Sequence, residues 1–206
     1  QTAGLRMGGY TGPVGTVLQN AVEEYNGSSW TSVTALPTAT GQGMFAGIQT
    51  AGLFYGGSAP SAVTTSLSYN GSSWTATNSL AVKKTQGAGF GTQTAAIAAG
   101  GANPDLGPGT STFTDNSQTW DGTNWTEIAE LNTNRRSGGG AGASNTSTLV
   151  FGGQTPPAPA NTVTANTESW NGSAWTEVNN LNTAKNQLAG TGTQTAALSF
   201  SGRTPA

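Results

Sequence analysis

The chain of 206 residues contains neither histidine nor cysteine. Without these residues it cannot assemble a Ser-His-Asp or Cys-His catalytic group. Zinc and copper sites likewise lose their usual ligands. Glycosidase chemistry needs only two carboxyl groups and therefore has to be tested separately. The candidate acidic pairs are Glu23 with Glu24, Glu127 with Glu130, and Glu168 with Glu177.

These carboxylates are better explained as surface charges. Glu23 and Glu24 are adjacent on a predicted strand, so their side chains point to opposite faces. Glu127 and Glu177 each follow a tryptophan by two residues on a predicted outer strand, where charges discourage edge-to-edge pairing. We expect all the paired carboxylates, Glu168 included, to be solvated at sheet edges. The sequence therefore predicts a protein that is not an enzyme, with no catalytic residue, no metal site and no cofactor.

Charge is sparse, with seven basic and nine acidic residues and a net charge of −2. Nucleic-acid binding would need a basic stripe, and the few cations are scattered. No apolar run approaches the roughly 20 residues that span a bilayer. We expect neither nucleic-acid binding nor membrane insertion. Thr, Ser, Asn and Gly fill the polar positions, as is typical of β proteins that work outside cells or on virions.

One short pattern occurs four times: an aromatic residue, Asn-Gly or Asp-Gly, two further residues and Trp-Thr. Asn-Gly and Asp-Gly suit a type I′ turn, and aromatic residues favour cross-strand positions, so the pattern predicts a β-hairpin. A leucine follows each tryptophan by six residues, which indicates packing anchors rather than sugar-stacking platforms. The anchors are Trp30, Trp74, Trp125 and Trp175, with turn glycines Gly27, Gly71, Gly122 and Gly172.

Two further elements repeat around each hairpin. A Gly/Ala-rich stretch predicts an inner strand a, and an apolar stretch that ends in a glycine pair predicts strand b. The hairpin supplies strands c and d. The chain then reads as a single domain, 1–206, with repeats at about 1–48, 49–92, 93–144 and 145–193 and a partial repeat at 194–206. This order gives b-c-d, three sets of a-b-c-d, and a final a-b.

A glycine pair closing an apolar strand, followed by an aromatic residue and then a tryptophan, resembles the kelch motif. The resemblance covers essentially the whole chain and implies an all-β fold, a β-propeller of four-stranded blades. The surplus strands leave open a ring of four or five blades or a window from a longer propeller. The wording "NGSSWT…L…GTQTAA…FGG" also resembles kelch-like proteins of marine bacteriophages of the cyanophage type, often described as tail-fibre or virion proteins.

The resemblance implies a structural and binding role on a phage virion or outside the cell. Its partners would be other virion proteins, copies of itself or a host-surface glycan. A free lectin-like or scaffold propeller of bacterial origin is the alternative, with a carbohydrate-active enzyme behind it. Binding residues are expected on the variable, proline-bearing loops between strands b and c. Our candidates there, placed after the glycine pairs, are Tyr10, Asn103, Asp105, Gln154 and Arg203.

Overall fold

The structure is a computed structural model that describes residues 3–12, 17–106, 113–156 and 162–204. Within these ranges the chain contains many short strands, one 3-10 helix at Pro104–Leu106 (η1) and no α-helix. Every strand pair is antiparallel. The predicted all-β class is therefore confirmed. No helix in the described part is long and apolar enough to cross a membrane.

The described strands form four sheets of three or four strands and a terminal hairpin, in the order predicted from the repeats, together with two short strand pairs that were not predicted. Sheet 1 has three strands, β1 (Gly4–Met7), β4 (Val22–Tyr25) and β5 (Trp30–Val33). Sheets 2, 3 and 4 each have four strands, and β20 (Asn186–Gly192) and β21 (Ala197–Arg203) form the terminal hairpin. Sheet 2 consists of β6 (Met44–Ile48), β7 (Ala51–Tyr55), β8 (Ser66–Tyr69) and β9 (Trp74–Ala76). Sheet 3 consists of β10 (Ala88–Thr92), β11 (Ala95–Ala99), β12 (Ser117–Trp120) and β13 (Trp125–Ile128), and sheet 4 of β14 (Gly139–Ser144), β15 (Ser147–Phe151), β18 (Thr167–Trp170) and β19 (Trp175–Val178). The two short pairs are β2 (Tyr10–Thr11) with β3 (Val17–Leu18) and β16 (Gln154–Thr155) with β17 (Thr162–Val163).

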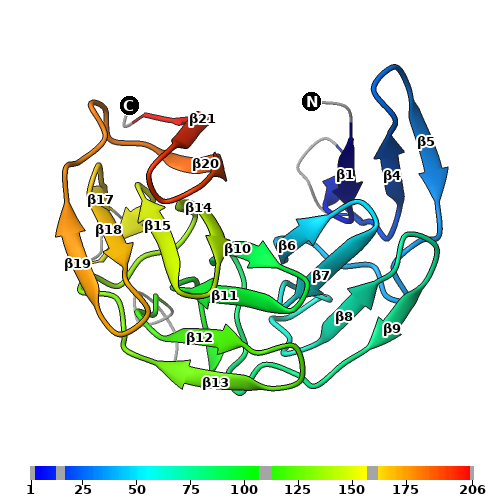
Figure 1. The fold of residues 1–206 in the computed structure, drawn as a ribbon, viewed down its shortest axis with the longest axis horizontal. Coiled ribbons are helices and arrows are strands. Elements are labelled where there is room, and N and C mark those ends of the chain that lie inside the picture. Colours follow the sequence, from blue (N-terminus) through cyan, green and yellow to red (C-terminus); the bar gives the residue numbers. More distant parts are fainter. Residues whose placement is uncertain (1–2, 13–16, 107–112, 157–161, 205–206) are drawn as a thin grey trace.

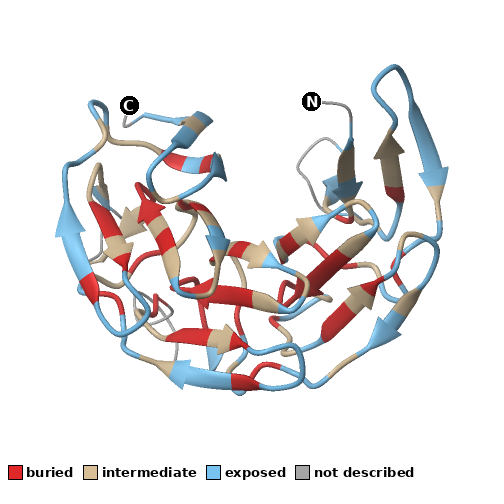
Figure 2. Cartoon of the chain, viewed as in Figure 1, coloured by how far each residue is buried: buried red, intermediate tan, exposed pale blue. Residues whose placement is uncertain are grey.

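The sheets follow one another around an open arc (Figure 1). Strands β6, β10, β14 and β20 lie side by side on the inside of the arc, and β5, β9, β13 and β19 lie on its outer rim. Sheet 1 and the terminal hairpin face each other across the gap in the arc. Burial is greatest between neighbouring sheets and least on the outer strands and at the two ends (Figure 2).

Close approach of the inner strands explains their small residues. A Cβ at Gly89 would lie 2.6 Å from the Cβ of Met44 in the preceding sheet. A Cβ at Gly140 would meet the ring of Phe90 at 2.2 Å, so this aromatic side chain fits only over a bare backbone. Glycine usually weakens a strand, but here it allows the sheets to pack at the centre of the arc.

The hairpins between strands c and d form where predicted, but their turns are not of type I′. Tyr25 pairs with Trp30, and Trp170 pairs with Trp175, which leaves a four-residue connection. Glycine has positive φ at this turn in every copy, as predicted, with 98° at Gly27 and 96° at Gly172, whereas the preceding asparagine does not. A type I′ turn needs positive φ at both central residues. The asparagine instead accepts two backbone hydrogen bonds, from Ser28 and Ser29 in the first copy at 3.0 Å each.

The hairpin tryptophans pack each sheet against the sheet before it. Trp125 lies 4.8 Å from Tyr55 between ring centroids, and its indole donates a hydrogen bond to Ser66 Oγ at 3.0 Å. Trp175 and Trp74 donate in the same way to main-chain carbonyls of the preceding sheet. These contacts place the three indoles against the preceding sheet. Trp125 and Trp175 are 9% and 6% exposed.

Trp30 is the exception, because no described segment covers its side of sheet 1. It is 54% exposed, although its place in the repeat is the same. At the other end of the arc, Leu198 and Phe200 on β21 are 60% and 47% exposed, whereas Leu53, at the position of Leu198 in sheet 2, is fully buried. The prediction of a core anchor is thus wrong for Trp30. The repeat specifies the residue, but burial requires a neighbouring sheet.

We predict different costs for truncating these equivalent tryptophans. Trp125→Ala and Trp175→Ala should each lower the free energy of unfolding by about 3–5 kcal/mol, because each leaves a cavity between two sheets. Trp30→Ala should cost less than about 1 kcal/mol, as for an exposed side chain. Urea unfolding followed by far-ultraviolet circular dichroism measures the three values. Equal losses at all three positions would contradict this packing.

Candidate functional site

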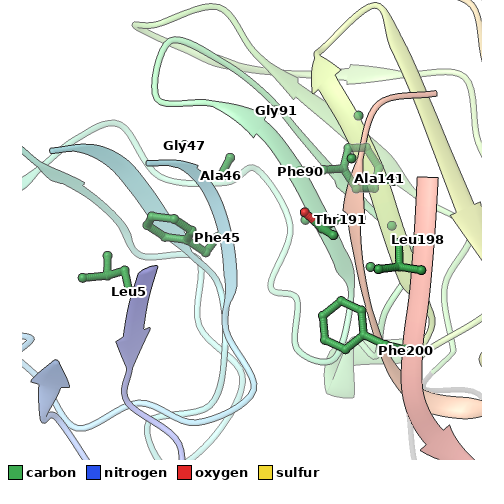
Figure 3. A pocket seen from close by; sticks show the side chains of 15 residues that line it. Leu5, Phe45, Ala46, Gly47, Phe90, Gly91, Ala141, Thr191, Leu198 and Phe200 are labelled. Atoms are coloured by element: carbon green, nitrogen blue, oxygen red, sulfur yellow. The ribbon is translucent and has the colours of Figure 1, made fainter. Parts of the chain in front are cut away.

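The central opening is lined by small and apolar residues. Its cavity of about 540 Å³ is bordered by the inner strands, with Leu5, Phe45, Phe90, Leu198 and Phe200 among its side chains (Figure 3). Among the described residues of that lining, Thr191 supplies the one polar side chain. A ligand there would find almost no directed hydrogen-bonding side chain. The cavity is therefore a consequence of packing the inner strands rather than a good recognition site.

A more polar surface lies at the edge where strands b end and strands a begin, which we call the loop face. It carries two adjoining cavities of about 240 Å³ each, and both are lined by Gln86. We call them the loop cavity and the collar cavity. The loop cavity is lined by Ser61, Ala62, Thr85, Gln86, Ala102, Pro104 and Arg136, and the collar cavity by Gln42, Gly43, Gln86, Gly87, Ser137, Gly138, Gln187 and Leu188.

Arg136 is the one charged residue among the described residues that line the loop cavity. Its guanidinium lies 4.4 Å from the ring centroid of Phe113, and its Nε donates to Gln154 Oε1 at 3.4 Å. The backbones of Arg136 and Gln154 also pair, which fixes the arginine against the loop after β15. Partial burial lowers the pKa of Arg136, but a guanidinium stays protonated in proteins. The side chain thus presents a fixed set of donors beside an aromatic face.

The five loop residues predicted from the sequence do not form one site. Asn103 is buried and caps its own loop by accepting from the Asp105 amide at 3.0 Å. Asp105 forms an exposed ion pair with Lys83 at 3.2 Å. Tyr10 packs over Gly41, and Arg203 lies at the end of β21 opposite Asn186. None of the five is among the described residues that line either cavity of the loop face, although Asn103 lies between Ala102 and Pro104 and Gln154 accepts from Arg136. Any ligand role for the five remains a prediction.

Parts of the proline-bearing loops, with Pro13, Pro108, Pro157 and Pro159, lie outside the described residues. Sequence reasoning missed Thr85, Gln86, Arg136 and Phe113. Gln42 and Gln86 carried a usable signal, since both stand directly before the Gly/Ala-rich inner strands. No sequence signal pointed to Arg136, because its position in the site depends on contacts with Phe113 and Gln154, which are distant in sequence.

Glu168 corrects the prediction that all the paired carboxylates are solvated at sheet edges. It is fully buried and bonded to Arg135, with 2.6 Å between Nη2 and Oε1. Its second oxygen accepts from the Asn132 amide at 2.7 Å. Arg135 also donates to the main-chain carbonyl of Asn166. Glu168 is thereby engaged as a structural ion pair, whereas Glu127, Glu130 and Glu177 are exposed, as predicted.

Lys84 is the corresponding buried cation one repeat earlier, four residues after the repeat leucine. Its side chain is fully buried and donates to the carbonyl and side-chain oxygens of Asn116 at 2.6 and 2.9 Å. Burial lowers its pKa to about 7, against the weaker opposing effects of Asp115 and Glu127. A lysine of this kind can serve as a catalytic group. However, Lys84 lines neither cavity of the loop face, and its contacts with Asn116 indicate a structural role.

Comparison with known proteins adds no family. The chain matches no family model and no curated protein. Among the described residues there is no group of three or more carboxylates, histidines or cysteines that could hold a metal ion. The chemistry of the loop face is therefore hydrogen bonding by side-chain amides and hydroxyls, together with Arg136.

We predict that Lys84 makes stability depend on pH. The folded protein holds this lysine with a pKa of about 7, whereas the unfolded chain titrates near 10.4. Between these values the unfolded state binds more protons, so stability should rise with pH, by at most about 1.4 kcal/mol per pH unit. Urea unfolding at several pH values from 7 to 9.5 measures the slope.

Lys84→Met should flatten this dependence, because methionine does not titrate. Lys185→Met is the matched control, since Lys185 occupies the same place in the last repeat but is partly exposed. It should leave the slope unchanged. A wild-type slope near zero, or one that survives Lys84→Met, would rule out the buried neutral lysine as its source.

Proposed function

We propose that the chain is a non-enzymatic, kelch-like β-propeller that presents its loop face for recognition. The four-stranded sheets of the arc correspond to blades, with the Gly/Ala-rich strands β6, β10 and β14 innermost. Contacts pass from each sheet to the next through equivalent residues, such as Trp125 and Trp175. Radial repetition of this kind is the defining property of propellers.

We propose further that it belongs to a phage virion, in a tail fibre or decoration, or acts outside the cell. The support is the resemblance of its repeat wording to phage proteins, together with its sparse charge. Other virion proteins or copies of the chain are the proposed structural partners. The exposed apolar residues at the ends of the arc, Trp30, Leu198 and Phe200, support such association, because apolar patches often mark contact surfaces.

The ligand class that suits the loop face is a host-surface glycan. The observation that carries this proposal is the pair of adjoining cavities that share Gln86 and are lined by amides, hydroxyls and one arginine. Amide side chains offer donors and acceptors together, which match the hydroxyl groups of sugars. Phe113 beneath Arg136 keeps this donor set in place.

A free lectin-like or scaffold propeller of bacterial origin has the same site and differs in its location. A carbohydrate-active enzyme is less supported, because Glu168 is bonded to Arg135 and Glu177 is exposed on the rim. The described chain offers neither histidine nor cysteine as a substitute. Recognition without turnover is the function that these residues support best.

We predict that the purified chain binds a subset of glycans on a printed array. Arg136→Ala should reduce binding about tenfold or more, as expected when a charge-assisted hydrogen bond is lost. Lys83→Ala, which removes an exposed cation outside the cavity linings, is the control and should bind normally. No binding by the wild-type chain would contradict glycan recognition and leave a structural role.

The virion assignment has its own measurement. Mass spectrometry of purified phage particles from the source sample should detect peptides of this chain at a stoichiometry constant across preparations. Detection only in host-cell secretions would favour the lectin-like alternative.

A further inference from the structure

Four residues with left-handed backbone conformation stand at equivalent places, directly before or at the start of the inner strands. We call them the collar: Gln42, Gln86, Ser137 and Gln187, with φ values of 55°, 58°, 56° and 52°. This region of φ is uncommon for residues other than glycine. An unusual backbone conformation in every repeat requires a structural or functional reason.

The backbone of the collar has a structural reason. The backbone N–H of Gln86 donates to the backbone carbonyl of Gln42 at 3.1 Å, and the backbone N–H of Ser137 donates to the backbone carbonyl of Gln86 at 2.8 Å. The amide of Gln187 continues the series to Ser137 at 2.7 Å. These hydrogen bonds join successive inner strands at one mouth of the central opening. They explain the left-handed conformation, but they involve only main-chain atoms.

The side chains of the collar are not explained by this arrangement. Glycine would make the same hydrogen bonds and adopts positive φ without the cost that a Cβ imposes. The chain uses glycine freely elsewhere: seventeen described glycines have positive φ, against five other residues, and the collar supplies four of those five. Keeping glutamine at three of these places indicates that its side chain has a use of its own.

That use is available in the collar cavity, which all four residues line. The neighbouring Gly43, Gly87 and Gly138 leave the backbone bare, and Leu188 adds one apolar side chain. Among the described residues that line this cavity, none is charged. The cavity of about 240 Å³ lies below the roughly 300–1,000 Å³ of pockets for drug-sized ligands, which suits one small ring.

Hydrogen-bonding capacity remains unused there. Oε1 of Gln86 is buried and has no hydrogen-bond partner among the described residues. Such an unsatisfied acceptor calls for a partner. Rotation about the soft terminal bond of the side chain would present it to a ligand hydroxyl. Oε1 of Gln42 already accepts from the Thr85 hydroxyl at 3.2 Å, which orients this amide at the cavity wall.

We propose that the collar is the binding subsite for a single neutral sugar ring, the terminal residue of the glycan recognised by the loop face. The inference rests on the proposed function and locates its specificity. Three glutamine amides and a serine hydroxyl would bind the ring hydroxyls, and the absence of charge in the lining favours a neutral sugar. Arg136 in the adjoining cavity would contact the next part of the glycan.

Glycine substitution separates binding from folding at these positions. Gln86→Gly removes the amide and relieves the left-handed conformation, so the melting temperature should stay or rise while affinity falls about tenfold or more. Gln86→Ala keeps the left-handed strain that the wild type already has, so it should lose affinity without the rise in melting temperature that glycine allows. Ser201→Gly is the matched control, since Ser201 has φ of 64° outside the collar, and it should bind normally.

The probes are glucose, galactose, mannose, N-acetylglucosamine and the acidic sugar sialic acid. Binding is measured by saturation-transfer NMR, beside the glycan array and thermal unfolding. Because Gln86 also lines the loop cavity, the collar is supported only if binding of a neutral sugar is lost in Gln86→Gly and also in Gln187→Gly, since Gln187 lines the collar cavity alone of the two. Loss in Gln86→Gly alone overturns the collar. If wild type and Gln86→Gly bind the array equally, the collar inference fails and glycan recognition stands. Preference for sialic acid also overturns the collar, and no binding by wild type overturns both proposals.

Discussion

The contact between successive sheets is the interaction on which the structure depends. No single sheet can bury its own faces, so each repeat is stabilised by the next through a tryptophan, a leucine and small inner residues. The indole hydrogen bond fixes the direction of the contact, because Trp125 and Trp175 donate to the preceding sheet. Stability therefore accumulates along the arc and is lowest at its two ends, where Trp30 and Phe200 are exposed.

Polar groups close the same contacts where apolar side chains do not reach. Lys84 and Arg135 occupy one position in consecutive repeats, yet one bonds to Asn116 and the other to Glu168. Lys84 Nζ and the Arg135 guanidinium donate to main-chain carbonyls that a fully apolar junction would leave unsatisfied. The same position can thus hold a lysine or an arginine with different partners while the sheets keep the same arrangement. For this reason some of the few charged residues are buried inside the protein.

The left-handed residues of the collar belong both to the scaffold and to the proposed ligand surface. Left-handed residues connect the inner strands through main-chain hydrogen bonds, which leaves their side chains free for another purpose. In our proposal the collar uses this freedom for recognition. The loop cavity beside it depends on irregular loops, and Arg136, which lies over Phe113, stands where the other repeats have Gly41, Thr85 and Asn186. In this proposal the collar would contact a sugar ring through equivalent residues of several repeats, and the loop cavity with Arg136 would select among glycans.

The sequence by itself determined the strands, their order and the positions of the hairpins, because alternation, glycine pairs and Asn-Gly turns act over a few residues. Turn geometry was only half predictable: glycine has the expected positive φ, but the asparagine side chain caps the turn instead. Tertiary structure decided burial. Trp125 and Trp30 occupy identical places in the repeat, yet Trp125 is buried and Trp30 is exposed. Packing between sheets also buries Glu168 in an ion pair with Arg135. It also brought Gln42, Gln86 and Gln187 together, since neighbours across an arc are set by packing between sheets and not by local sequence.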